Sequence, residues 1–182
     1  SRSHQRTTTT TTRKKGPEPK APPNSLSLTD VPCLASNHSG YRAATVLATC
    51  QSLYETHNLT SYPRTDCAYL PESQFADAPA ILEALKGVVP ELESLIDGAN
   101  PKIKSKTWND AKITAHHGII PTVQAGDASK LSSEERAIHN LIVRYYLAQF
   151  YPVHEYLNTA VELDVSGEQI FANRSEEHTS EL

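Results

Sequence analysis

The chain has 182 residues, of which 38% are hydrophobic, and a formal net charge of −4 at pH 7. No apolar run approaches the roughly 20 residues that span a bilayer, and the polar start has no signal-peptide stretch, so we expect no membrane insertion. The three cysteines are an odd number without a C-x-x-C pair, which argues against a disulfide framework and a local zinc knuckle.

Residues 1–25 are predicted to be a basic, extended segment rich in threonine and proline. Threonine favours extended backbone, and proline is confined to edges and linkers because it cannot donate to a ladder. Positive charge also gathers further along the chain. This second cluster consists of Lys102, Lys104, Lys106 and Lys112. Such clusters are compatible with phosphate binding, although the negative net charge argues against a simple nucleic-acid-binding protein.

Helical spacing begins at Arg42 and precedes an extended stretch. Asn58 suits the left-handed position after a helix. Residues 59–67 are then expected to be extended, and Pro63 disfavours the α region for Tyr62. The pattern therefore predicts that Tyr62 lies on a loop after a helix. The apolar face of that helix comprises Val46, Leu47, Cys50, Leu53 and Tyr54.

Three further helices are predicted, with glycine or proline at their ends. The first includes residues 78–85 before Gly87, and the second includes residues 92–96 before Gly98. The third opens with the capping box Ser132-x-x-Glu135 and ends before Pro152. Its apolar stripe comprises Ile138, Leu141, Ile142 and Tyr145.

Alternating apolar residues predict a strand over 159–165 and a short strand over 169–172. Residues 174–182 resemble the translated read-through of a sequencing adapter, so we expect a non-native tail. The fold class is therefore mainly α with minor β. The predicted parts are the extended segment 1–25, a helical domain 26–130, a connecting helix 131–152, strands 153–173 and the tail 174–182.

The stretch Ser61-Tyr-Pro-Arg-Thr-Asp-Cys67 has the residue types for nucleophilic attack on phosphate. A tyrosine hydroxyl has an ordinary pKa near 10, so it needs nearby positive charge or a base to act as a nucleophile. Arg64 lies two residues after Tyr62, and positions i and i+2 of an extended segment face the same way. Its guanidinium could hold a phosphate by two hydrogen bonds. A structural Tyr-x-Arg pair on the surface is the alternative.

A second stretch, Thr114-Ala-His-His-Gly-Ile-Ile-Pro-Thr122, contains two adjacent histidines. They cannot both face one point on a regular element, so we expect one imidazole to contact phosphate or assist proton transfer. A structural loop histidine is the alternative. Metal-dependent hydrolysis by His116 and His117 ranks last, because no carboxylate or cysteine lies nearby at ligand spacing.

Together the two stretches resemble the signature pair of type IA DNA topoisomerases, specifically the bacterial topoisomerase III branch. The resemblance covers residues 13–172 and includes several other motifs in the family's order, among them Trp108-Asn-Asp110. It implies a helical domain that carries the catalytic tyrosine, flanked by strands of the β arch domain. The flanks 13–25 and 153–172 would be those strands.

The resemblance implies a role for each site residue. Tyr62 would join to the 5′-phosphate of a cut single strand, Arg64 would position the scissile phosphate, and His116 would contact DNA beside it. These three form the expected catalytic set. Weaker expectations for DNA contact fall on Thr65, Thr114, His117 and Thr122. The alternative for the three threonines is a structural role, which for Thr65 would be to hold the loop in shape.

The implied parent is an isomerase, a type I DNA topoisomerase that cleaves one strand, passes another and religates without ATP. The resemblance implies Mg²⁺ in the parent enzyme, with ligands outside this sequence, so we expect no metal or cofactor bound by this chain and no efficient cleavage by it alone. The implied partner is single-stranded DNA, for a monomeric parent in the cytoplasm at the nucleoid. Roles in DNA recombination and repair follow from the same resemblance.

Two other functions stay open from the residues. A non-catalytic single-stranded nucleic-acid-binding module could use the basic segments and stack bases on aromatic side chains such as Trp108, although burial of Trp108 in a core is the simpler expectation. A tyrosine recombinase would also use a tyrosine nucleophile, but it would attach to the 3′-phosphate.

Overall fold

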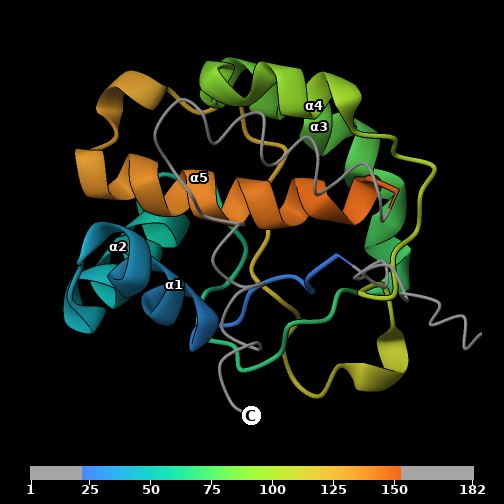
Figure 1. The fold of residues 1–182 in the computed structure, drawn as a ribbon, viewed down its shortest axis with the longest axis horizontal. Coiled ribbons are helices and arrows are strands. Elements are labelled where there is room, and N and C mark those ends of the chain that lie inside the picture. The colour runs from blue at the N-terminus through green and yellow to red at the C-terminus, as the bar shows by residue number, and fades with distance from the viewer. Residues whose placement is uncertain (1–21, 153–182) are drawn as a thin grey trace, which may run out of the picture.

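The computed structural model describes residues 22–152, which form helices around the long central helix α5 (Figure 1). In this view α3 and α4 lie above α5, while α1 and α2 lie below it. The α-helices are α1 (Asp30–Ser39), α2 (Ala43–Glu55), α3 (Ala78–Val88), α4 (Glu93–Gly98) and α5 (Ser133–Leu147). Short 3-10 helices are η1 (Glu72–Asp77), η2 (Pro90–Leu92), η3 (Asp110–Lys112), η4 (Ala128–Lys130) and η5 (Ala148–Phe150).

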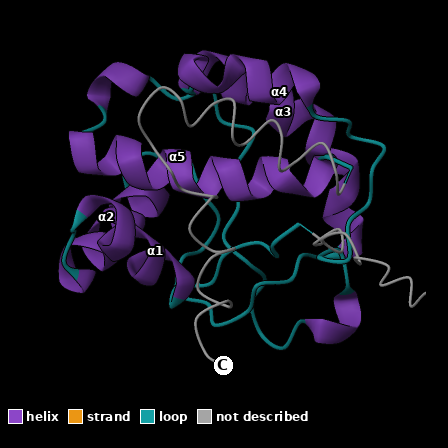
Figure 2. Ribbon diagram, viewed as in Figure 1, coloured by secondary structure: helices purple, strands orange, loops and turns teal. Residues whose placement is uncertain are grey.

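The prediction of a mainly helical fold is confirmed. Within the described residues, however, the predicted minor β content does not appear as strands. Figure 2 shows helices and loops without a strand over 22–152, where pairing is limited to isolated bridges. The predicted arch strands at 153–173 lie outside the described residues, as does most of the segment 1–25. The three bridges are Leu26 with Ile119 and Thr60 with Pro121, both antiparallel, and Leu70 with Trp108, parallel.

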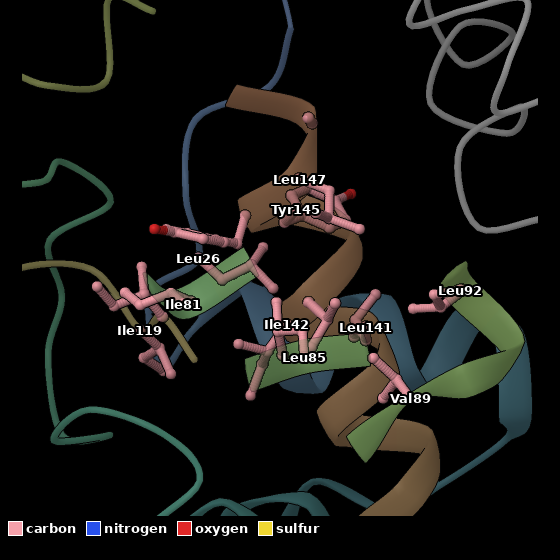
Figure 3. Packing of buried hydrophobic residues seen from close by; sticks show 14 of the residues in the cluster. Leu26, Ile81, Leu85, Val89, Leu92, Ile119, Leu141, Ile142, Tyr145 and Leu147 are labelled. Carbon is pink, nitrogen blue, oxygen red and sulfur yellow. The ribbon is translucent and has the colours of Figure 1, made fainter. Parts of the chain in front are cut away.

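Helix α5 is buried around its whole circumference from residue 138 to residue 147. The predicted stripe of apolar residues is buried as expected, and Figure 3 shows Ile142 and Leu141 packed with Leu85 and Val89 of the α3 region. The polar residues between them are buried as well, although a surface helix would expose them. One of these, Asn140, donates a hydrogen bond of 2.9 Å to Glu91. Helix α5 is therefore the centre of the core.

Helix α2 spans the predicted residues, but its buried face is narrower than predicted. Val46, Cys50 and Leu53 are buried, and Leu53 is completely inaccessible. Leu47 is 42% exposed, however, and Tyr54 is only half-buried. The prediction that these two belong to the core face is wrong, because α1 and α5 cover only one side of α2.

Helices α3 and α4 follow the predicted glycine and proline pattern closely. The predicted face of α3 is buried at Ala78, Ile81, Leu82 and Leu85. Helix α3 continues one residue past Gly87 and ends at Val88. Trp108 packs edge-on against Phe75 and is 4% exposed, so the simpler expectation of burial in the core is confirmed for this side chain.

Helix α1 was not predicted from the sequence. Asp30 accepts hydrogen bonds from the backbone N–H and the hydroxyl of Ser27, at 2.9 and 2.7 Å. At the other end Gly40 adopts φ 66°, a left-handed conformation that suits glycine, and its N–H donates to the carbonyl of Ser36. Local hydrogen bonds thus define both ends of a helix whose apolar spacing is weak.

No helix among residues 22–152 is both long enough and apolar enough to cross a membrane.

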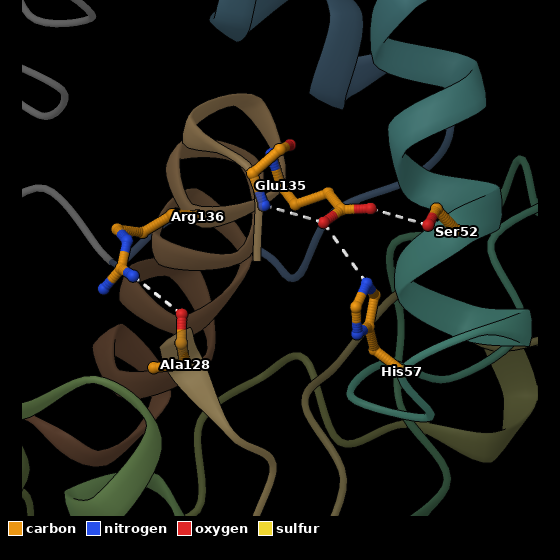
Figure 4. A network of polar contacts seen from close by, with 6 residues as sticks. Ser52, His57, Ala128, Glu135 and Arg136 are labelled. Atoms are coloured by element: carbon orange, nitrogen blue, oxygen red, sulfur yellow. Dashed lines mark hydrogen bonds and ion pairs between the residues drawn. The ribbon is translucent and has the colours of Figure 1, made fainter. Parts of the chain in front are cut away.

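The predicted capping box is present at the start of α5 and also links this helix to α2 (Figure 4). The Ser132 hydroxyl accepts from the N–H of Glu135 at 3.1 Å, and the Glu135 carboxylate accepts from the N–H of Ser132 at 2.9 Å. The same carboxylate accepts from the Ser52 hydroxyl at 2.6 Å and lies 3.2 Å from His57 Nε2. The Ser52 hydrogen bond is the largest cause that holds the pKa of Glu135 below its usual value.

Replacing Ser132 with alanine should lower the free energy of unfolding by about 1 kcal/mol, because the N–H of Glu135 loses its acceptor. Urea unfolding of the 182-residue chain measures this change. The matched control is Ser133→Ala, since the Ser133 hydroxyl donates to the neighbouring Glu134 carboxylate at 3.0 Å and takes no part in the capping box. Equal stability of the two variants would contradict the capping role.

Candidate active site

The segment that carries Tyr62 lies beside the segment that contains the two histidines. The N–H of Ser61 donates to the carbonyl of Ile120 at 2.8 Å, and the N–H of Ile120 donates to the Ser61 hydroxyl at 3.0 Å. One step further, the N–H of Thr122 donates to the carbonyl of Leu59 at 3.1 Å. Backbone pairing therefore brings together two sequence motifs that lie about fifty residues apart.

Residues 25–28 form a third extended segment against these two. The N–H of Leu28 donates to the carbonyl of Thr65 at 2.7 Å, and the N–H of Ile119 donates to the carbonyl of Leu26 at 2.8 Å. Gly118 permits the close approach, because a Cβ there would lie 3.0 Å from the Ser25 hydroxyl. The Tyr62 segment is thus held on both sides through its backbone.

The ring of Tyr62 is partly exposed and lies between two other rings. Its side chain is 37% accessible, and within residues 22–152 no hydrogen bond engages its hydroxyl. The His116 ring lies 4.6 Å away, tilted by 39°, and the Tyr54 ring packs edge-on at 5.6 Å with an interplanar angle of 85°. The ring is therefore supported while its hydroxyl remains available to a ligand.

Arg64 is exposed on the same segment. Its Nε donates to Oε1 of Gln51 on α2 at 3.4 Å, and the amide nitrogen of Gln51 donates in turn to the Glu55 carboxylate. Within the described part of the chain no carboxylate forms an ion pair with this guanidinium. The terminal nitrogens of Arg64 can consequently receive an anionic ligand.

The two adjacent histidines point to different partners, as their sequence predicted. His116 is exposed and packs on the ring of Tyr62. His117 is half-buried, and its ring nitrogens contact the Gly118 carbonyl at 2.8 Å and the side-chain amide of Gln74 at 3.3 Å. Of the two histidines, only His116 therefore lies against the ring of Tyr62.

The three threonines named from the sequence occupy different positions. Thr65 is buried, and its hydroxyl accepts from the N–H of Cys67 at 3.1 Å and lies 3.4 Å from the His116 carbonyl. The Thr122 hydroxyl donates to the carbonyl of Asn58 at 2.7 Å, and Asn58 has the predicted left-handed conformation with φ 55°. These two hydroxyls join the loops to each other, whereas Thr114 is exposed beside the histidines.

Two residues of this site, Gln51 and Tyr54, were not predicted. Both lie on α2, three positions apart, and so face the same side of the helix. The sequence around Gln51 and Tyr54 did not indicate a site, because its pattern of apolar and polar residues is that of any helix packed on a core. Only the contact between α2 and the Tyr62 segment brings them to the site.

The second basic cluster is partly neutralised by an acidic neighbour. Lys104 forms an ion pair of 2.8 Å with Glu72 and lies 6.0 Å from the centre of the Phe75 ring. It lies away from the contacts that surround Tyr62.

The described residues contain no large cluster of metal-ligating side chains. Among residues 22–152 no three side chains of histidine, cysteine, aspartate or glutamate gather as they would around a metal ion. The three cysteines are free thiols, with Cys33 exposed and the other two buried. Burial raises the pKa of Cys50 to about 12, so this thiol stays protonated at neutral pH.

Comparison with known proteins gives consistent matches over most of the chain. A model of the family described as DNA topoisomerase matches residues 1–180. DNA topoisomerase 3 of Vibrio cholerae is 38% identical over 148 residues, which cover 81% of this chain and 23% of that protein. The enzyme of the same name from Haemophilus influenzae is 40% identical over 150 residues, which cover 82% and 23% of the two chains.

A relative with lower identity gives a similar result. DNA topoisomerase 3 of Bacillus subtilis is 34% identical over 163 residues, which cover 87% of this chain and 22% of that protein. The chain therefore spans less than a quarter of the length of these relatives.

Proposed function

Because the chain belongs to the type IA DNA topoisomerase family, in the branch whose members are called DNA topoisomerase 3, we propose that Tyr62 is the nucleophile that cleaves single-stranded DNA. The phenol oxygen forms a bond to the phosphorus of a phosphodiester, and the bond from phosphorus to the 3′ oxygen breaks. The phenol proton ends on the released 3′ oxygen, directly or through solvent. The product is a 5′-phosphotyrosine and a free 3′-hydroxyl.

The reaction is reversible without an external energy source. One phosphodiester replaces another, so the 3′-hydroxyl can attack the phosphotyrosine and restore the strand. Between the two steps the protein holds one broken end covalently, and another strand can pass through the gap. Religation then completes a change of DNA topology without ATP.

Arg64 and His116 have complementary roles in this proposal. The exposed guanidinium of Arg64 holds the scissile phosphate by charge-assisted hydrogen bonds, which are stronger than neutral ones. His116 lies against the Tyr62 ring, where its imidazole can donate to the same phosphate or carry a proton. Thr114 is exposed beside these histidines and can contact an adjoining backbone phosphate.

One structural observation is the main support for the proposed function. Two motifs that are far apart in the sequence meet at an exposed tyrosine whose ring lies 4.6 Å from a histidine ring. Two residues further along the same segment, an exposed arginine has no carboxylate partner in the described part of the chain. Chemistry on a phosphate needs both groups accessible.

The proposal extends to the whole protein, of which this chain would be one part. The flanks 13–25 and 153–172 would be strands of the β arch domain, next to the helical domain that carries Tyr62. The Mg²⁺ of the whole protein would take its ligands from outside this sequence, as the resemblance to the family implies. The parent would be a monomer that acts on single-stranded DNA of the nucleoid in the cytoplasm, in recombination and repair.

The test uses a relative's full-length DNA topoisomerase 3 in which residues 22–152 of this chain replace the matching segment. A single-stranded oligonucleotide is labelled at its 3′ end or at its 5′ end, incubated with the chimera and denatured. Attachment to the 5′-phosphate leaves the 3′ label on the protein and releases the 5′ label. We expect this result.

The other outcomes identify the alternatives. A 5′ label on the protein would mean attachment to the 3′-phosphate, as in a tyrosine recombinase. Binding before denaturation without any covalent label would favour a non-catalytic module that binds single-stranded nucleic acid. Either result contradicts the proposed function.

A further inference from the structure

One face of α2 reaches both exposed side chains of the candidate site. Tyr54 packs edge-on against the Tyr62 ring, and Gln51 accepts a hydrogen bond from Nε of Arg64. Because the two residues are three positions apart on a helix, they form one continuous surface. The backbone hydrogen bonds of the Tyr62 segment fix its main chain but do not orient the side chains of Tyr62 and Arg64.

We propose that α2 is a positioning surface, in which Tyr54 sets the ring orientation of Tyr62 and Gln51 sets the orientation of the Arg64 guanidinium. This role rests on the proposed function, because it concerns the geometry of the same nucleophile and the same phosphate-binding group. Neither residue of α2 reacts. Each restricts the rotamers of its neighbour before DNA arrives.

The edge-on contact of Tyr54 suits this role. Aromatic rings prefer edge-to-face geometry, in which the positive edge of one ring meets the negative face of the other. An interplanar angle of 85° at 5.6 Å lies within that preference. Together with His116, Tyr54 packs against the ring of Tyr62, a residue that remains 37% exposed with both neighbours in place. Losing such a contact should reduce the population of the productive rotamer by about 3- to 10-fold.

The hydrogen bond of Gln51 also has a defined direction. Glu55 lies one turn further along α2, and its carboxylate can only accept, so the amide nitrogen of Gln51 faces Glu55. The amide oxygen of Gln51 then faces Arg64 and accepts a hydrogen bond from its Nε at 3.4 Å. The edge of the guanidinium formed by its two terminal nitrogens is left for a phosphate, in the fork geometry that binds two oxygens.

Helix α2 is rigid enough to serve as this surface. Leu53, between the two residues, is completely buried. Ser52 is bonded to the Glu135 carboxylate at the start of α5, which ties α2 to the central helix (Figure 4). A support fixed to the core can hold side chains that are themselves exposed to solvent.

The first test is the nuclear Overhauser contact between the rings of Tyr62 and His116 in the 182-residue chain. Tyr54→Phe retains the ring and should retain this contact at full intensity. Tyr54→Leu removes the ring edge and should weaken the contact by several-fold, at unchanged far-ultraviolet circular dichroism. An unchanged contact in Tyr54→Leu would overturn the positioning role of Tyr54.

The second test measures single-turnover cleavage by the chimera with a relative's DNA topoisomerase 3. At saturating single-stranded DNA, Tyr54→Leu and Gln51→Leu should each slow formation of the covalent adduct by about 3- to 10-fold, with DNA affinity changed by less than about 2-fold. Tyr54→Phe should restore the rate. Leu47→Ala is the matched control, because Leu47 is exposed on α2 one turn before Gln51.

The outcomes separate the two proposals. A chimera that forms an adduct equally fast with and without Tyr54→Leu and Gln51→Leu overturns the positioning role and leaves the proposed function intact. An unsubstituted chimera that folds and binds DNA without forming any adduct contradicts the proposed function. Slower adduct formation at unchanged affinity, restored by Tyr54→Phe, supports both.

Discussion

Replacing Tyr62 with phenylalanine is expected to abolish covalent attachment to DNA while leaving DNA binding and the fold unchanged. The substitution removes one oxygen, which is the atom proposed to bond phosphorus, and leaves the neighbouring rings of Tyr54 and His116 in place. Adduct formation should fall by at least ~1,000-fold, to background, because loss of a nucleophile cannot be compensated by binding. Denaturing gel analysis of the labelled oligonucleotide measures the loss.

The fold should tolerate this change because the contacts of Tyr62 are made by its ring. The rings of Tyr54 and His116 pack on a phenylalanine in the same way, and within residues 22–152 no hydrogen bond involves the hydroxyl. The free energy of unfolding should therefore change by less than about 0.5 kcal/mol, as for most surface substitutions. Affinity for single-stranded DNA should stay within about 2-fold, because Arg64 and His116 are retained.

The matched control is Tyr69→Phe. Tyr69 lies on the same extended segment and is half-buried, but it is outside the cluster formed by Tyr54, Tyr62 and His116. Removing the Tyr69 hydroxyl should leave adduct formation at the level of the unsubstituted protein. If Tyr62→Phe still became covalently attached to DNA, the nucleophile would be another residue and the proposed function would be wrong.

Local signals in the sequence predicted most of the helices because their ends are formed locally. The capping box of Ser132 and Glu135 needs only four consecutive residues, and both of its hydrogen bonds are present. Asn58 likewise adopts the left-handed conformation its type allows. Helix α1 escaped prediction because its apolar spacing is weak, although Asp30 and Gly40 define its ends.

Burial of polar residues could not be predicted from periodicity. His139 and Asn140 read as the solvent face of a helix, yet both are buried. The hydrogen bond from Asn140 to Glu91 shows why, since the partner comes from a segment almost fifty residues away. Spacing along one helix carries no information about which distant groups cover its polar side.

Local sequence likewise predicted one part of the site, while the rest depends on contacts between distant segments. An extended loop with Tyr62 and Arg64 was predicted from Pro63 and the residue types alone. The meeting of Tyr62 with His116 followed only from the resemblance to a family, because no spacing rule links residues so far apart. The contribution of Gln51 and Tyr54 depends on how α2 lies against the loop, and neither source predicted it.

Acidification should destabilise the protein through His139, and this is the largest effect on stability that the structure predicts. His139 is 1% exposed on the central helix α5. Burial lowers its pKa to about 4, which outweighs the opposing effects of the Glu91 carboxylate and the Leu59 carbonyl. The folded state therefore holds this imidazole neutral at pH values where an unfolded chain, with an ordinary pKa near 6.5, protonates it.

The sign of the effect follows from which state binds the proton. Between pH 6.5 and pH 4 the unfolded state binds more protons at this position, so stability falls as the pH falls. The contribution is complete above pH 6.5, and between pH 7.5 and pH 4.5 it should amount to a loss of about 2 to 3 kcal/mol. Urea unfolding of the 182-residue chain at the two pH values measures the total change.

A His139→Gln variant isolates the contribution, because glutamine does not titrate and every other group titrates in both proteins. The variant should be less stable at pH 7.5, yet it should lose about 2 to 3 kcal/mol less than the unsubstituted chain on acidification. Equal losses in the two proteins would contradict a neutral, buried His139.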